Sequence, residues 1–284
     1  MPNVTDLPCE IIASMFGKFD DIVCLSNSLL VCRKFYTSYL ESPGLKEDIL
    51  DRQIGDRLLP QAIALQLLSS SQAPEERHKI LDTLYRNPSQ LRDRLRDIPL
   101  TDTLQIGRRH SVIHDLIVGF SKSAWSLLSE EELVLSDDEY WRFGRAFYRF
   151  DMLCVLIRAT TGDFDRFNVP QTPKIELLSR HAPWENEQIA CVHDFLESIL
   201  AEGKTASPAV SYVPLTESTA MYDVLAHDVD FGEYSVDYLS RGGDASRTQQ
   251  WVGSASHALI TTHNPLITPP AIGGARFFAP DLLN

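Results

Sequence analysis

The chain has 284 residues, of which 44% are hydrophobic and 23% are charged, a composition typical of a folded globular protein. The formal net charge of −13 argues against non-specific nucleic-acid binding, because phosphate contacts need clustered lysine and arginine side chains. We find no apolar run long enough to span a membrane and no signal-peptide pattern at the start. We therefore expect a protein of the cytoplasm and/or the nucleus.

Helical periodicity dominates the first forty residues. Apolar side chains recur along one face of residues 7–19, and Pro8 fits the first turn of such a helix, where its missing N–H costs nothing. An aspartate pair at residues 20–21 offers an N-cap for a second helix. A third helix is predicted over residues 31–40, before a Pro-Gly pair.

Helical patterns continue through most of the remaining chain. The first of them is expected to break or kink at Pro60, and a Ser-rich segment at 69–74 is a plausible hinge. We find no strand alternation and no leucine-rich, WD, kelch or tetratricopeptide repeat. The predicted helices cover about residues 46–68, 75–86, 88–97, 103–122, 137–158, 174–181 and 184–201, with weaker pieces near 218–228 and 246–262.

These patterns predict an all-α fold in three parts. Residues 4–45 form a three-helix unit, and residues 46–202 form one non-repetitive helical domain. Residues 203–284 form a helical and irregular extension packed on that domain, with an irregular tail rich in proline and glycine. A unit of about forty residues has too little core to stand alone, so it must bury a second face on a partner or on its own chain.

One predicted helix, at 137–158, is rich in aromatic residues, and core packing is expected of it and of the helix at 184–201. Residues 137–158 are apolar on several sides, which is typical of a central helix. Arg145 and Arg149 lie one turn apart on it and are expected to pair with acids of the helix at 184–201 or to stack on rings. Anion binding by these arginines is the alternative. On the second helix the predicted apolar stripe is Trp184, Gln188, Cys191, Val192, Phe195 and Ile199, and the acids expected to point largely away from it are Glu185, Glu187, Asp194 and Glu197.

A search for catalytic or metal-binding residues finds no convergent set. His110 and His114 lie one turn apart, but Ser111 stands where a zinc protease has glutamate, so packing or surface roles are expected. The Asp-Phe-Gly triplet at 230–232 lacks the other segments of a kinase. The acids in the runs at 129–132 and 137–139 fit two helix starts, and metal binding by them is the weaker alternative. The five cysteines form no Cys-x-x-Cys pair and are expected to be reduced, buried thiols. We expect no catalytic residue, no metal and no cofactor.

The N-terminal segment resembles the F-box family. The resemblance rests on Leu-Pro-Cys-Glu-Ile-Ile at residues 7–12, on Phe16, and on Leu-Leu-Val-Cys-Arg-Lys-Phe-Tyr at residues 29–36. The spacing between Phe19 and the second motif is one residue longer than is common in the family, which blurs the alignment of the second helix. What the resemblance implies is an apolar helical surface that docks on a Skp-type adaptor and, through it, on a cullin. The residues carried over to this contact are Leu7, Pro8, Ile11, Ile12, Leu29, Val31 and Cys32.

The segments at 145–150 and 183–196 are similar to parts of uncharacterised fungal F-box-like proteins with an all-helical remainder. Together the two resemblances imply a non-enzymatic substrate receptor of a ubiquitin ligase, whose helical domain binds an unknown target protein. One alternative is a scaffold or interaction protein whose F-box-like end is packed internally and meets no ligase. A helical enzyme with an unrecognised pocket is the other.

Overall fold

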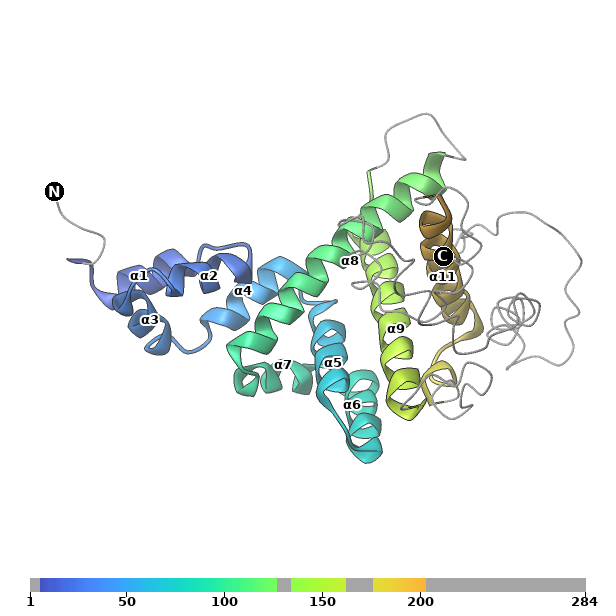
Figure 1. Cartoon of the computed structure of the whole chain (residues 1–284), viewed down its shortest axis with the longest axis horizontal. Helices are drawn as coiled ribbons and strands as arrows, with labels where there is room; N and C mark the ends of the chain where they lie inside the picture. The colour runs from blue at the N-terminus through green and yellow to red at the C-terminus, as the bar shows by residue number, and fades with distance from the viewer. Residues whose placement is uncertain (1–5, 127–133, 162–175, 203–284) are drawn as a thin grey trace, which may run out of the picture.

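The computed structural model describes residues 6–126, 134–161 and 176–202. All regular elements within these ranges are helices, which confirms the predicted all-α fold. The molecule is elongated, with α1, α2 and α3 at one end and α9 and α11 at the other (Figure 1). The features predicted at 129–132, at 230–232 and throughout the extension at 203–284 lie outside the described residues.

The N-terminal unit consists of α1 (Cys9–Phe16), α2 (Ile22–Leu29) and α3 (Arg33–Leu40). Pro8 is the N-cap of α1 rather than part of its first turn, and its carbonyl accepts the N–H groups of Ile11 and Ile12. Asp21 caps α2 as predicted, because its carboxylate accepts the backbone N–H of Val23 at 2.8 Å. The third helix begins two residues later than predicted, so Val31 lies in the turn before it.

The next helices are α4 (Leu45–Ile54), α5 (Leu59–Ser70), α6 (Pro74–Arg86) and α7 (Ser89–Arg94), followed by the 3₁₀ turn η2 (Leu95–Asp97). The break predicted at Pro60 is wrong in position, because the helix ends at Gly55 and Pro60 lies in the first turn of α5. Gly55 has φ of +83°, a conformation that favours glycine, and its N–H bonds the carbonyl of Asp51. The predicted hinge is a short turn at 71–73 between α5 and α6, which pack against each other.

Three long helices complete the described fold: α8 (Leu100–Ser126), α9 (Asp137–Thr161) and α11 (Pro183–Glu202). α8 runs from the N-terminal unit to the opposite end of the molecule, and α9 packs on α5, α8 and α11 (Figure 1). Phe120 of α8 meets Phe143 and Phe147 of α9 and Phe195 of α11 edge-on, with ring centroids 5.0–6.1 Å apart. The aromatic helix is therefore central, as its pattern predicted. Of the short helix predicted at 174–181, residues 176–178 are helical.

The first turn of α11 differs from the prediction. Trp184 is 70% exposed and does not belong to the buried stripe, whereas Val192 and Phe195 are buried. Glu185 was expected to point away from the core, but its side chain is only 17% exposed. Its carboxylate turns inward because it pairs with Arg145 and with Arg149 of α9, which confirms the pairing predicted for these arginines.

The apolar core is continuous from α1 to α11. The boundary predicted between residues 45 and 46 falls in the first turn of α4, and the core continues across it. α2 packs on α4 and α8, and this contact buries Ile22 and Leu25 completely. The inner face of the N-terminal unit is therefore covered by its own chain.

Candidate docking surface

Exposed large apolar side chains are concentrated in the N-terminal unit. Among the described residues, six of the nine such side chains lie between positions 11 and 40. The other three, Trp125, Val134 and Trp184, belong to three separate segments of the helical domain. Single exposed apolar residues are ordinary on a protein surface, whereas a concentration of them marks an interaction site. The six are Ile11, Met15, Leu30, Val31, Tyr36 and Leu40.

The first part of this surface is the outer face of α1. Ile11 and Met15 are one helical turn apart, and each is 48% exposed. Pro8 is also exposed, just before the helix. The opposite face of α1 carries Ile12 and Phe16, which are 1% and 4% exposed. α1 thus divides its apolar side chains between the core and the solvent.

The second part is the turn between α2 and α3 together with the outer face of α3. Leu30 is 84% exposed and Val31 is 70% exposed, and their N–H groups bond carbonyls in the last turn of α2. Tyr36 and Leu40 follow one turn apart on α3 and are 49% and 61% exposed. The inner face of α3 carries Phe35, whose ring meets Phe16 of α1 edge-on at 5.3 Å. We call the six exposed apolar side chains together with Pro8 the docking surface.

The seven residues predicted to bind an adaptor fall into two groups. Pro8, Ile11 and Val31 are exposed, and Leu7 and Cys32 are half-buried, so all five can be reached. Ile12 and Leu29 are 1% and 8% exposed and belong to the core of the N-terminal unit, so in this structure they offer little surface to a partner.

Four exposed residues of the docking surface were missed: Met15, Leu30, Tyr36 and Leu40. Met15 could have been found from its position one turn after Ile11, and Leu40 from its position one turn after Tyr36. Leu30 follows the buried Leu29 directly, and only the start of the turn places it outside.

A polar joint holds the inner face of the N-terminal unit on the rest of the chain. The side-chain oxygen of Gln53 accepts the N–H of Ile22 at 3.2 Å. Its amide nitrogen donates to the carboxylate of Asp21 at 3.2 Å and to the carbonyl of Gly107 at 3.4 Å. Arg52 donates to the carbonyl of Phe19 at 2.7 Å. Gln53 of α4 therefore ties the start of α2 to α8.

His110 and His114 each form a hydrogen bond with a tyrosine of α9. His110 Nδ1 lies 3.0 Å from the Tyr148 hydroxyl, and His114 Nδ1 lies 2.9 Å from the Tyr140 hydroxyl. Burial lowers the pKa of His110 to about 4 and raises the pKa of Tyr140 to about 12, so the first imidazole and the phenol are neutral. Across the described ranges, no group of three or more His, Cys, Asp or Glu side chains is arranged to hold a metal ion.

All five cysteines are free thiols, in agreement with the prediction. The expectation that they are buried is wrong for most of them, because only Cys154 is buried and Cys24 is exposed. Cys9 and Cys32 are half-buried at the starts of α1 and α3. The wrong expectation arose because apolar neighbours in sequence do not fix which face of a short helix a side chain occupies.

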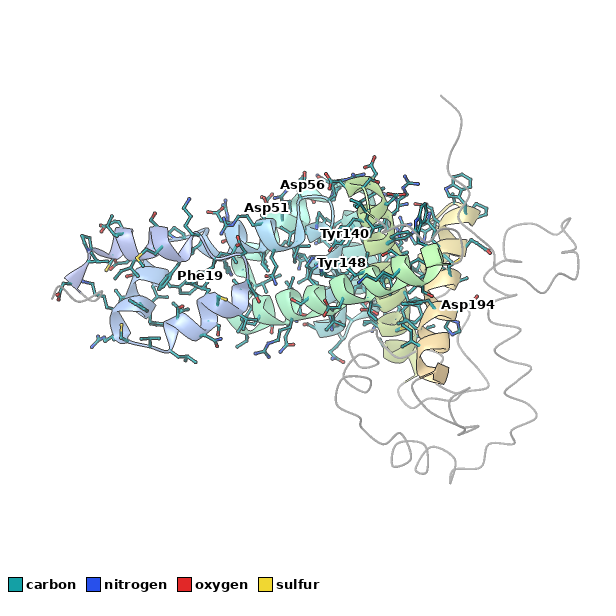
Figure 2. The ribbon with its side chains drawn as sticks, turned by 90° about the horizontal axis from the view of Figure 1, so that it is seen from above. Phe19, Asp51, Asp56, Tyr140, Tyr148 and Asp194 are labelled. Carbon is teal, nitrogen blue, oxygen red and sulfur yellow. The ribbon has the colours of Figure 1, made fainter. Side chains whose placement is uncertain are left out.

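Figure 2 shows how far the docking surface lies from the other end of the molecule. Phe19 marks the N-terminal unit, while Tyr140, Tyr148 and Asp194 lie toward the opposite end.

Comparison of the chain with protein-family models, with curated proteins and with solved structures finds no match. In the part of the chain that is described, no helix has the length and apolar character needed to cross a membrane.

Proposed function

We propose that the chain is a substrate receptor of the F-box type, whose docking surface binds a Skp-type adaptor and, through it, a cullin. The helical domain then presents a target protein, and the transfer chemistry belongs to other subunits, so the chain contributes proximity and orientation. The receptor would act in the cytoplasm and/or the nucleus. One observation carries the proposal: six of nine exposed large apolar side chains gather in thirty residues of the F-box-like segment.

The arrangement of the N-terminal unit supports a partner on its outer face. Complete burial of one large aliphatic side chain contributes about 1.5–3 kcal/mol, so several half-exposed or exposed side chains can supply a tight interface. The inner face is already occupied by α4 and α8, and Gln53 ties the two together. Docking on the outer face therefore needs no opening of the core.

The scaffold alternative, in which the F-box-like end is packed internally, does not explain the docking surface. It accounts for Ile12 and Leu29, which are buried, but it leaves Val31 and Leu30 in solvent. A different helical partner on the same outer face is the remaining form of this alternative. The experiment below separates it from the F-box proposal.

The test compares two exposed valines. Val31→Asp places a charge on the docking surface, and Val134→Asp places the same charge on an even more exposed valine outside it. We expect Val31→Asp to weaken calorimetric binding of a purified Skp-type adaptor at least about a hundredfold, because a buried unpaired carboxylate is costly. Val134→Asp should bind like the unchanged protein, and thermal melts of both variants should stay close to it.

The result that would overturn the proposal is failure of the unchanged protein to bind the adaptor, or equal binding by both variants. A pull-down from cells with and without residues 1–45 then asks whether the outer face recruits another partner. Recovery of a partner that depends on Val31 but contains no Skp-type adaptor would support the scaffold alternative.

A further inference from the structure

A second polar site lies at the opposite end of the molecule, where α11 begins beside α9. One carboxylate oxygen of Glu185, Oε1, forms an ion pair with Arg145 Nη2 at 3.1 Å and accepts a hydrogen bond from Arg149 Nη1 at 3.0 Å. The other oxygen, Oε2, accepts the backbone N–H of Ala182 at 3.2 Å. The side chains of Arg145, Arg149 and Glu185 are only 16%, 6% and 17% exposed. One buried guanidinium group, that of Arg149, and one half-buried group, that of Arg145, thus share one carboxylate.

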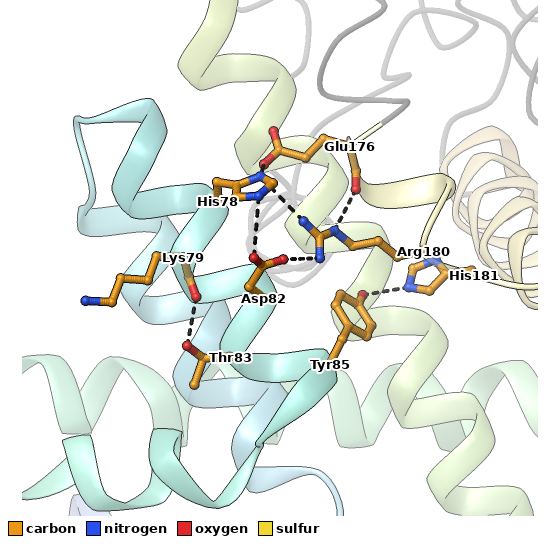
Figure 3. Close-up of polar contacts among 8 residues, drawn as sticks. All are labelled: His78, Lys79, Asp82, Thr83, Tyr85, Glu176, Arg180 and His181. Carbon is orange, nitrogen blue, oxygen red and sulfur yellow. Dashed lines mark hydrogen bonds and ion pairs between the residues drawn. The ribbon is translucent and has the colours of Figure 1, made fainter.

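The charges of this cluster do not balance. Burial raises the pKa of Glu185, but the two guanidinium groups hold it below its usual value, so the carboxylate is ionised. Arg180, which lies beside Tyr85, is paired with Asp82 at 2.5 Å (Figure 3), so its charge is already balanced. Among the described residues no second carboxylate pairs with Arg145 or Arg149, so one positive charge is left over. A buried charge without a counter-charge is costly.

Unpartnered polar atoms gather at the same place. His181 Nε2 lies 2.6 Å from the Tyr85 hydroxyl (Figure 3), and burial lowers the pKa of this histidine to about 4, so it contributes no charge. The Nε–H groups of both arginines of the cluster are buried donors without an acceptor. The other ring nitrogen of His181, Nδ1, is also buried without a hydrogen-bond partner.

We propose that this group, the Glu185 cluster (Tyr85, Arg145, Arg149, His181 and Glu185), is a binding site for a phosphate-type oxyanion. Such a group would supply the missing negative charge beside the two arginines. The first turn of α11 adds a favourable dipole, since an anion is stabilised at a helix N-terminus. Trp184, exposed beside Glu185, offers an apolar surface to whatever carries the phosphate. The proposal does not depend on adaptor docking at the other end.

The test uses inorganic phosphate and free O-phosphoserine as probes, with sodium chloride at matched ionic strength as the reference. We expect the melting temperature of the full chain to rise saturably with phosphate and to stay constant with chloride. Binding of both phosphate probes shows that the site reads the phosphate group, while binding of inorganic phosphate alone restricts the ligand to the free ion.

Three variants separate a binding site from an ordinary structural ion pair. Arg145→Gln should weaken phosphate binding at least about tenfold, whereas Arg142→Gln on the same helix, whose side chain bonds a backbone carbonyl of its own turn, should not. Glu185→Gln removes the competing carboxylate and should tighten phosphate binding by about tenfold or more.

The change in phosphate affinity in Glu185→Gln distinguishes a binding site from a structural ion pair. A purely structural ion pair predicts lower stability and no gain in affinity. Equal stabilisation by chloride, unchanged binding by Arg145→Gln, or no tightening in a folded Glu185→Gln protein would each overturn the proposal. Phosphate affinity is read by calorimetry, so a loss of stability in any variant does not obscure the outcome.

Discussion

At the N-terminal end of the molecule large apolar side chains lie on the surface, whereas at the α9–α11 end charged and polar side chains lie in the interior. Val31 and Leu30 stand in solvent, while Arg149 and Asp151 are 5% and 0% exposed. Both arrangements are costly for an isolated chain, since exposed apolar patches invite association and buried charges lose their hydration. The comparison therefore locates two places where a ligand or partner would lower the free energy of the chain.

The two ends also differ in how their elements are fastened. In the N-terminal unit three short helices share a small core and lean on α4 and α8 through Gln53. At the other end, ion pairs and hydrogen bonds join α6 to residues 176–181, with Arg180 bonded to Asp82 and Tyr85 to His181 (Figure 3). Such polar contacts specify one arrangement of the elements, because leaving any one partner unpaired in the interior is unfavourable.

Neighbouring isoleucines of α1 give the largest expected effect and separate the inner from the outer face. Ile12→Ala should lower the free energy of unfolding by about 2–5 kcal/mol, because it empties a fully buried site. Ile11→Ala, in a side chain that is 48% exposed, should change it by less than about 0.5 kcal/mol and should instead weaken adaptor binding. Urea denaturation and calorimetric binding of both variants measure the two effects. Similar losses of stability in both would mean that the outer face of α1 is covered.

The stability of the folded chain should depend on pH because of a buried histidine, His110. Burial lowers the folded-state pKa of His110 to about 4, whereas an unfolded histidine titrates near about 6.5. The unfolded state therefore binds the proton more tightly, and the stability present above about pH 6.5 is lost as the pH falls toward about 4. For His110 this loss amounts to at most about 3 kcal/mol.

Urea midpoints measured between about pH 7 and pH 4.5 check this expectation. His110→Gln should reduce the pH dependence, because glutamine keeps a hydrogen-bonding group near Tyr148 without a titrating proton. The part that remains comes from His181, whose pKa burial also lowers to about 4. The carboxylates of Asp82 and Glu185 have lowered pKa values and contribute to acid sensitivity only below this window. An unchanged slope in His110→Gln would show that His110 is accessible to protons in the folded state.

Much of the helical architecture could be predicted from sequence because apolar periodicity reports which segments bury one face. The observed helix boundaries differ from the predicted ones where a local backbone conformation ends a helix, as at Gly55 with its positive φ. The i, i+4 spacing of Arg145 and Arg149 correctly predicted pairing with the α11 helix. It could not show that Glu185 turns inward, because an acid at a helix start is usually solvated.

The docking surface was predicted only in part for a related reason. Ile11 and Ile12 are equally apolar and adjacent, and a short helix has an apolar stripe wide enough to include both. Only the packing of α3 and the rest of the chain decides that Ile12 enters the core and Ile11 does not. Periodicity gives the presence of an apolar face, while the tertiary contacts decide how much of it remains exposed.

Substitutions at two glycines of α8 are expected to change the free energy of unfolding least. One glycine lies where α8 meets the N-terminal unit, and the other lies toward the opposite end of the same helix. A Cβ atom at Gly107 would lie 2.3 Å from Cγ2 of Ile22 and 3.1 Å from the side-chain oxygen of Gln53. Ile22 is fully buried and has little room to move, so Gly107→Ala should destabilise the chain by about 1–3 kcal/mol. At Gly119 the nearest atom, Cζ of Phe195, lies at an ordinary 3.7 Å. Gly119→Ala should therefore stabilise the chain by up to about 1 kcal/mol, since alanine favours a helix interior.

The measurable result is that Gly107→Ala and Gly119→Ala should change the free energy of unfolding in opposite directions. Urea denaturation gives the free energies, and amide hydrogen exchange locates the change, because Gly107→Ala should lower protection in α2 more than in α9. That pattern would show that the N-terminal unit is held by close contact of α2 with α8 at Gly107. Stabilisation by both substitutions would mean that α2 can move away from α8 at little cost. The docking surface would then be carried on a loosely attached unit, and its orientation toward the helical domain would not be fixed by the joint at Gln53.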